Sequence, residues 1–244
     1  MDRYSRHYLL EQIGKDGQQK LGAARVLVVG MGGLGSPAAL YLAAAGTGTL
    51  GIADADRVDL TNLQRQVLYR TKDEGRRKVE VAKESLLELN PGISVAVHDT
   101  FIDGDNAGSI VSRYDVVLCA IDSFQGRLAL NDACVAATIP CIHAGVSGLE
   151  GQVMTYLPGS SCYRCVFPFA SDDGRPDQAK PPLFGTLGPA AGIAGTMQAA
   201  EAIKYICGFG SMLQNRLLVF DLGMASFSTL DVRRNASCRA CSVK

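Results

Sequence analysis

The sequence predicts an α/β protein with a doubly wound, mostly parallel sheet that is followed by antiparallel strands. Three observations predict this fold. Apolar runs of strand length alternate with helical patterns, a glycine-rich turn follows the first of these runs, and four cysteines form two close pairs in the last third of the chain. We expect a single domain over residues 1–244. Within it, residues of about 24–145 would form the first half, which contains the glycine-rich turn. Residues of about 146–244 would form the second half, which contains the cysteine pairs.

The first predicted strand and helix flank the glycine-rich turn. Arg25–Val29 is a largely apolar run, which is typical of a buried parallel strand. Ser36 is a good N-cap residue, and Pro37 suits the first helical position. We therefore expect a helix that begins there, continues through the alanine-rich run to Ala45 and is stopped by Gly46.

The rest of the first half continues this alternation. Further strands are expected at Thr49–Ala53, Ser94–His98, Asp115–Ala120 and Pro140–Ala144, with helices at Lys78–Leu89, Asp105–Ser112 and Arg127–Ala137. Residues 56–76 break the pattern because they are polar and irregular. A connection of that length without regular structure is uncommon, which favours a functional role for it.

The last third of the chain has a different pattern. Glu150–Leu157, Leu217–Asp221 and Phe227–Arg233 are expected to be antiparallel strands, and a helix is expected at Gly192–Ile206, closed by Gly208. The segment Phe169–Pro182 is rich in Asp, Pro, Lys and Gly, and we predict that it is a mobile loop.

Composition excludes several classes of partner. The chain has 24 Lys plus Arg and 24 Asp plus Glu, so no net field favours nucleic acid or an anionic membrane. No apolar stretch approaches the roughly 20 residues of a membrane span, and the polar N-terminus shows no secretory signal. We expect a cytoplasmic protein whose remaining cysteines are small buried hydrophobes; these are Cys119, Cys134, Cys141 and Cys207.

The glycine-rich turn predicts a nucleotide phosphate site of the Rossmann-like kind. Gly30, Gly32, Gly33 and Gly35 lie between the first strand and the first helix. Glycines there allow a tight turn and a close approach of the backbone to phosphate, while the helix N-terminus favours negative charge. Asp54 ends the second strand, where a carboxylate binds a ribose hydroxyl. NAD, FAD and ATP proteins share this pattern.

A triphosphate explains the irregular segment better than a dinucleotide does. Arg65 lies in this segment, Arg76, Arg77 and Lys78 come at its end, and Asp122 follows the fourth strand. Cations offset the charge of a triphosphate, and a carboxylate can hold Mg²⁺. A dehydrogenase has little use for several extra cations and a free carboxylate at this edge of the sheet.

The two cysteine pairs predict a structural zinc site. Cys162 and Cys165 form one Cys-x-x-Cys pair, and Cys238 and Cys241 form the other. Four thiolates provide the tetrahedral set that Zn²⁺ prefers, with no open position for catalysis. We expect the metal to hold the structure together.

These motifs resemble the ThiF/MoeB/HesA family, the bacterial relatives of ubiquitin-activating enzymes. The resemblance runs over nearly the whole chain. It includes Gly30–Gly35, Asp54-x-Asp56, Asn62–Gln66, Lys78, Asp122 and both cysteine pairs. It implies an ATP-dependent enzyme that adenylates the C-terminal Gly-Gly of a small ubiquitin-like β-grasp sulfur carrier, releases pyrophosphate and acts as a homodimer. The second half of the chain would bind the carrier.

The resemblance also implies roles for individual residues. The glycine turn would line the ATP phosphates and Asp54 would bind the ribose, while Asp122 would hold Mg²⁺. Arg6 would reach the active site of the other protomer. The residues Asn62, Arg65 and Lys78 would contact the phosphates, and Asp56, Gln64 and Ser123 are further nucleotide-binding candidates. Of these, Arg6, Arg65, Lys78 and Asp122 are the catalytic candidates.

The chain departs from the family pattern in one place that affects the mechanism. Members that link covalently to their carrier have a cysteine in the loop before the Gly185–Pro189 stretch, where this chain has Pro181. Residues 166–206 contain no cysteine. We therefore expect adenylation only, with sulfur delivered by another protein such as a sulfurtransferase or a cysteine desulfurase. Smaller departures are Ser123 for the usual Asn and His7 for the usual Gln.

Three other functions stay open. An NAD(P)-dependent oxidoreductase would use the same glycine turn, although no residue is an obvious hydride-transfer acid. A zinc-stabilised binding protein that has lost catalysis would explain Ser123 and the missing loop cysteine. An enzyme that modifies tRNA is a further option within the family, but the zero net charge argues against it. The sequence leaves open which carrier, and therefore which sulfur pathway, is served.

Overall fold

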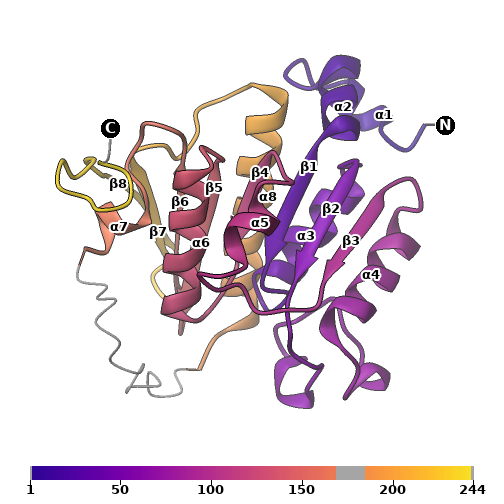
Figure 1. Cartoon of the computed structure of the whole chain (residues 1–244). Coiled ribbons are helices and arrows are strands. Elements are labelled where there is room, and N and C mark those ends of the chain that lie inside the picture. Colours follow the sequence, from indigo (N-terminus) through magenta and orange to yellow (C-terminus); the bar gives the residue numbers. More distant parts are fainter. Residues whose placement is uncertain (1, 169–184, 243–244) are drawn as a thin grey trace.

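The computed structural model describes residues 2–168 and 185–242. The predicted mobile loop at Phe169–Pro182, with Pro181, lies outside these residues. The described chain forms one eight-stranded sheet in the order β3-β2-β1-β4-β5-β6-β7-β8, with helices on both faces (Figure 1). This is the doubly wound, mostly parallel fold with C-terminal antiparallel strands that the sequence predicts.

Five parallel strands make up the first part of the sheet. They are β1 (Arg25–Val29), β2 (Thr49–Ala53), β3 (Ser94–His98), β4 (Val116–Cys119) and β5 (Cys141–Ser147). The chain passes from β1 outward to β2 and β3 and then returns to place β4 on the other side of β1. The strand order therefore reverses between β1 and β4, and ligands bind at such switch points in open α/β sheets.

Three antiparallel strands extend the same sheet beyond β5. They are β6 (Glu150–Tyr156), β7 (Arg216–Asp221) and β8 (Ser226–Asp231). The predicted antiparallel segments are confirmed, with ends that differ by a few residues. Every residue of β8 is exposed, because β8 is the edge strand and none of the helices in the described part of the chain packs on it.

The helices divide between the two faces of the sheet. Apolar residues of α3 (Gly35–Ala44), α4 (Lys78–Leu89) and α8 (Gly188–Cys207) pack on one face, and those of α5 (Ala107–Val111) and α6 (Phe124–Ala136) on the other. Alternate residues of β1 point to opposite faces of the sheet. Val28 packs in the core with α3, α4 and α8, and Leu27 packs in the core with α5 and α6. No helix in the described part of the chain is long and apolar enough to cross a bilayer.

The start of α3 differs from the prediction. The helix begins at Gly35 with Leu34 as its N-cap, so Ser36 lies inside the first turn instead of capping it. The Ser36 hydroxyl is buried and donates to the Met31 carbonyl at 3.5 Å. The glycine turn leads directly into the helix, so the N-cap position falls at Leu34, before Ser36 is reached.

Two N-terminal helices are not anticipated by the sequence patterns. They are α1 (Ser5–Tyr8) and α2 (Gly14–Ala23), at the top of Figure 1. The glycines and polar residues of α2 hide its helical period, and the helix is held instead by tertiary packing of Leu21 and Ile13 near Cys207 at the end of α8. Helix propensity is a weak prior that such packing overrides.

Candidate nucleotide site and metal centre

The glycine turn is packed so closely that two of its glycines admit no side chain. Gly30 has a φ of +91°, and a Cβ atom there would lie 2.5 Å from the carbonyl oxygen of Ala120. A Cβ at Gly35 would overlap the carbonyl oxygen of Gly30. The backbone of β1 can therefore turn into α3 only with glycine at both ends of the motif.

Replacing Gly35 with alanine is expected to destabilise the protein strongly. The new methyl group meets backbone, which cannot rotate away, so the turn itself has to shift. We expect a loss of about 2–3 kcal/mol, measured by urea unfolding. Gly22→Ala is the matched control, because nothing lies within 4 Å of a Cβ at that helical position. Equal stability of the two variants would contradict this view of the turn.

The middle of the turn offers open hydrogen-bond donors. Among residues 2–168 and 185–242, none accepts a hydrogen bond from the N–H of Gly32 or Gly33. Gln66 lies beside them, with its Nε2 3.5 Å from where a Cβ of Gly32 would be, and its buried Oε1 has no partner within those residues. Donors of this kind, at a helix N-terminus, fit an anionic phosphate group.

Asp54 is tied to this turn and does not face open solvent. The carboxylate accepts hydrogen bonds from the N–H of Met31 at 2.7 Å and of Asp56 at 2.8 Å. Burial raises the pKa of Asp54, and the positive charge of Lys78 and these two hydrogen bonds oppose that rise. The carboxylate fixes the glycine turn against the end of β2, at the place predicted for the ribose.

Lys78 and Asp56 meet at the start of α4. The Lys78 ammonium lies 2.9 Å from the Asp56 carboxylate, and the lysine side chain is only 5% exposed while that of Asp56 is 54% exposed. The ion pair with Asp56 offsets part of the cost of burying the lysine charge. The neighbouring Arg77 donates to the Ala55 carbonyl at 2.7 Å and forms an ion pair with Asp99 at 3.4 Å.

The irregular segment, residues 56–76, packs against the glycine turn. It contains two short 3-10 helices, η1 (Leu60–Asn62) and η2 (Thr71–Asp73). The side chain of Arg65 lies on Gly33. If Gly33 had a Cβ atom, that atom would be 3.3 Å from Cγ of Arg65. The carbonyl of Gln64 would lie 2.7 Å from a Cβ at Gly188, the first residue of α8. The half-buried Asn62 side chain donates to the Thr61 hydroxyl at 3.3 Å.

Asp122 lies across the switch point from the glycine turn. It follows β4 in the chain, three residues after Cys119, and is exposed. Ser123 comes next and caps α6, since its hydroxyl accepts from the N–H of Gly126 at 3.3 Å. The carbonyl of Ala120 packs on Gly30, so Asp122 and the turn share one edge of the sheet.

Within its own chain, Arg6 lies near the amino-terminal ends of the parallel strands, opposite the glycine turn. It is exposed on α1. Tyr4, two residues earlier, reaches Asn90 at the end of α4 with a 2.9 Å hydrogen bond and packs on Gly46, just before β2 begins. These contacts are at the amino-terminal ends of the parallel strands, so within one chain Arg6 is not brought to the predicted phosphate site.

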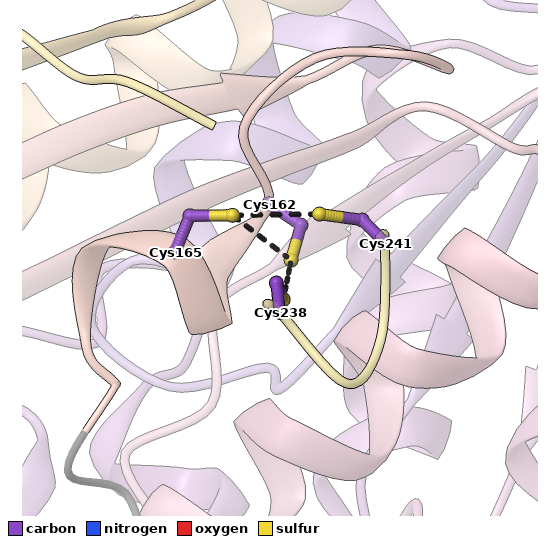
Figure 2. A group of neighbouring side chains, drawn as sticks. All are labelled: Cys162, Cys165, Cys238 and Cys241. Atoms are coloured by element: carbon purple, nitrogen blue, oxygen red, sulfur yellow. Dashed lines mark hydrogen bonds between the residues drawn. The ribbon is translucent and has the colours of Figure 1, made fainter. Parts of the chain in front are cut away.

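The four cysteines predicted to bind metal converge (Figure 2). Their sulfur atoms lie within 4.8 Å of one another, with Cys162 3.6 Å from Cys238 and Cys165 3.4 Å from Cys241. A tetrahedral ion with Zn–S bonds of about 2.3 Å requires sulfurs about 3.8 Å apart. Burial, and secondarily the neighbouring thiols, raise the pKa of Cys162, so four thiolates here need a cation. The cluster fits a structural zinc ion.

This metal centre is remote from the glycine turn. Cys162 follows β6, whose last residue, Tyr156, pairs with the first residue of β5, Cys141. The cluster therefore lies near the amino-terminal ends of the parallel strands, whereas the turn and Asp122 lie near their carboxyl ends. The cysteines outside the cluster are buried and free, as predicted; these are Cys119, Cys134, Cys141 and Cys207.

The structure also shows residues at the site that the sequence patterns do not single out. The Tyr69 hydroxyl is buried and donates to the Met31 carbonyl at 2.7 Å, which anchors the irregular segment to the glycine turn. Burial raises the pKa of Tyr69 well above its usual value, with the charges of Asp54 and Asp56 acting the same way, so it stays a donor. No local pattern marks such a tyrosine, because its partner is 38 residues away.

Comparison with known proteins agrees with this geometry. The model of the ThiF family matches residues 4–240. The chain belongs to the ThiF family. A ThiF-family relative from Escherichia coli (strain K12), the sulfur carrier protein ThiS adenylyltransferase, is 42% identical over 241 residues, which are 98% of this chain and 94% of the relative.

Two further relatives bear on function. The adenylyltransferase and sulfurtransferase MOCS3 of Culex quinquefasciatus is 45% identical over 249 residues; the match covers 98% of this chain but only 55% of that relative. The structure of E. coli MccB with ATP superposes with a TM-score of 0.83 at 28% identity, covering 99% of this chain and 74% of MccB. This ThiF-family chain is thus similar to adenylyltransferases and to a protein solved with ATP.

Proposed function

We propose that this ThiF-family protein is an ATP-dependent adenylyltransferase that activates the C-terminal Gly-Gly of a small ubiquitin-like sulfur carrier. The observation that carries the proposal is the site at the switch point, where the side chain of Arg65 lies against Gly33, next to the open N–H groups of Gly32 and Gly33, and where Lys78 and Asp122 lie at the same end of the strands. Relatives named as adenylyltransferases support it, and one of them is named as the adenylyltransferase of the sulfur carrier protein ThiS.

The reaction asks for positioning and charge compensation. A C-terminal carboxylate has a pKa of about 3.5, so it is ionised at neutral pH and needs no general base. One of its oxygens attacks the α-phosphorus of ATP, the bond from that phosphorus to the bridging oxygen breaks, and pyrophosphate leaves from an acyl-adenylate. Charge builds on the departing pyrophosphate, and fixed cations stabilise it.

Each of the predicted site residues has a place in this scheme. The glycine turn (Gly30, Gly32, Gly33, Gly35) would hold the phosphates, with Asn62, Gln64, Arg65 and Lys78 offsetting their charge. Asp54 and Asp56 would hold the ribose side, with Ser123 near the nucleotide. Asp122 would hold Mg²⁺, which when bound neutralises phosphate charge. The cysteine cluster would hold Zn²⁺ as a structural ion.

The proposal includes a homodimer and a separate sulfur donor. Arg6 lies too far from the site of its own chain to act there, which supports a role in the site of a second protomer. The absence of cysteine from residues 166–206 supports sulfur delivery by a sulfurtransferase or a cysteine desulfurase. The free cysteines support a reducing, cytoplasmic setting.

The test is ATP–pyrophosphate exchange with Mg²⁺, in which the purified protein is offered each small Gly-Gly-ending protein of its source organism. Exchange with one carrier establishes acyl-adenylate chemistry and names the partner. No exchange with any of them, despite bound ATP and a full zinc site, favours a non-catalytic binder or a non-protein carboxylate substrate. NAD found bound after purification favours the oxidoreductase alternative.

A further inference from the structure

Helix α6 connects the two functional ends of the molecule. Its first residue follows Ser123 and Asp122 at the predicted nucleotide site, and its last turns lie beside the cysteine cluster. The helix has 13 residues, and at 1.5 Å per residue it is about 20 Å long. A helix of that length behaves as a rod, so its fixation at one end affects the placement of the other.

The segment between the first two cysteines of the cluster contacts the far part of α6. This segment, Cys162–Cys165, contains most of the short helix α7 (Tyr163–Val166), and we call it the knuckle. The backbone N–H of Tyr163 donates to the Asn131 carboxamide at 2.9 Å. The guanidinium of Arg164 donates twice to the carboxylate of Asp132, at 2.7 and 2.6 Å. A bidentate pair of this kind fixes orientation as well as distance.

The same knuckle also reaches the first turn of α6. The Tyr163 ring stacks on His143 of β5 with ring centroids 4.8 Å apart, and its centroid lies 6.2 Å from that of Phe124, the first residue of α6. In the same turn of α6, Arg127 donates to the Ala144 carbonyl of β5 at 2.6 Å. Because Phe124 directly follows Ser123, the knuckle contacts α6 at its first turn as well as at Asn131 and Asp132.

The contacts between the knuckle and α6 are polar and directional. Asn131 is fully buried, and the Arg164 side chain is 6% exposed while that of Asp132 is 41% exposed. The buried groups depend on these hydrogen bonds, because a buried polar group without a partner costs free energy. The bidentate pair between Asp132 and Arg164 therefore fixes how α6 lies relative to the cysteine cluster.

We propose that Asp132 and Arg164 are positioning residues that couple the zinc knuckle to the nucleotide site. Through α6 they set the position of Asp122 and Ser123, so that an intact knuckle is needed for productive placement of the metal–nucleotide complex. The inference rests on the proposed adenylation for its kinetic test. The pair touches neither nucleotide nor carrier, and its effect passes through the helix.

The test compares Asp132→Asn with wild type and with Glu88→Gln, which removes a negative charge from an exposed position of α4. In Asp132→Asn all four cysteines remain, so we expect full zinc content. Since misplacement of about 1 Å can lower a rate up to 100-fold, we expect the Mg²⁺ concentration for half-maximal exchange to rise about 10-fold. The KM for the carrier is expected to stay unchanged, and Glu88→Gln to behave as wild type.

An unchanged Mg²⁺ requirement in Asp132→Asn would overturn the coupling. A loss of activity that is fully explained by a smaller fraction of folded protein would also overturn it.

Hydrogen exchange gives a readout that does not depend on adenylation. Amides of residues 124–128 are expected to exchange faster both in Asp132→Asn and after zinc removal from wild type. If wild type activates no carrier, the proposed function fails, and unchanged protection of these amides would then separately overturn the coupling.

Discussion

Replacing Asp122 with alanine is expected to abolish ATP–pyrophosphate exchange while leaving the fold intact. Asp122 is exposed at the carboxyl end of β4 and follows the strand rather than packing in it. Its loss removes the carboxylate that would hold Mg²⁺, and with it the compensation of phosphate charge as pyrophosphate leaves. Removing a single group that stabilises such charge lowers kcat by about 10²–10³, and we expect a loss in the upper part of this range or beyond.

Two controls make the Asp122 result interpretable. Thermal unfolding and zinc content should match wild type, because no core or ligand residue changes. Glu88→Ala removes an exposed carboxylate from α4 and should leave exchange intact. Retained exchange in Asp122→Ala, at saturating Mg²⁺, would exclude Asp122 from the metal-holding role.

Replacing Cys162 with alanine is expected to lower both zinc content and stability. Structural zinc sites contribute their binding energy to folding, and that energy is about 10–16 kcal/mol in small zinc peptides. Three remaining thiolates hold the ion far less tightly. A loss of about 4 kcal/mol would lower Tm by about 10 °C in a chain of this size, measured by calorimetry with metal analysis of the same sample.

Cys207→Ala is the matched control for that experiment. Cys207 is also a buried free cysteine, but it lies at the end of α8, with its thiol 3.5 Å from the Gly17 carbonyl and away from the cluster. We expect full zinc content and only a small drop in Tm for this variant. A Cys162→Ala protein with full zinc and an unchanged Tm would contradict a structural metal.

Much of the fold could be predicted because local pattern and tertiary structure agree there. β1, β2, β3 and α4 begin and end at the predicted residues, since each is a short apolar or periodic run that stops at a glycine, an aspartate or an asparagine. The prediction was wrong at Ser36, where the demands of the phosphate turn override a good N-cap residue. It missed α2, which depends on packing against α8.

The site divides in the same way. The glycine spacing and the cysteine spacing are local, so the turn and the cysteine cluster could be named in advance. The structure places the Arg65 side chain on Gly33 and Lys78 beside Asp56. Tyr69 on Met31, and Asp132 on Arg164, join residues 38 and 32 positions apart. Such pairs have no periodic pattern and depend on how the layers pack.

The cysteine cluster also joins parts of the chain that could otherwise be separated. Cys165 precedes α8, β7 and β8, and Cys238 follows them, so an ion bound by the cluster would close a loop that contains these three described elements. A chain divided at one point inside that loop would still be cross-linked through the ion, with β7 paired to β6. Two separately expressed pieces could therefore reassemble when zinc is added, and a chelator would release them again.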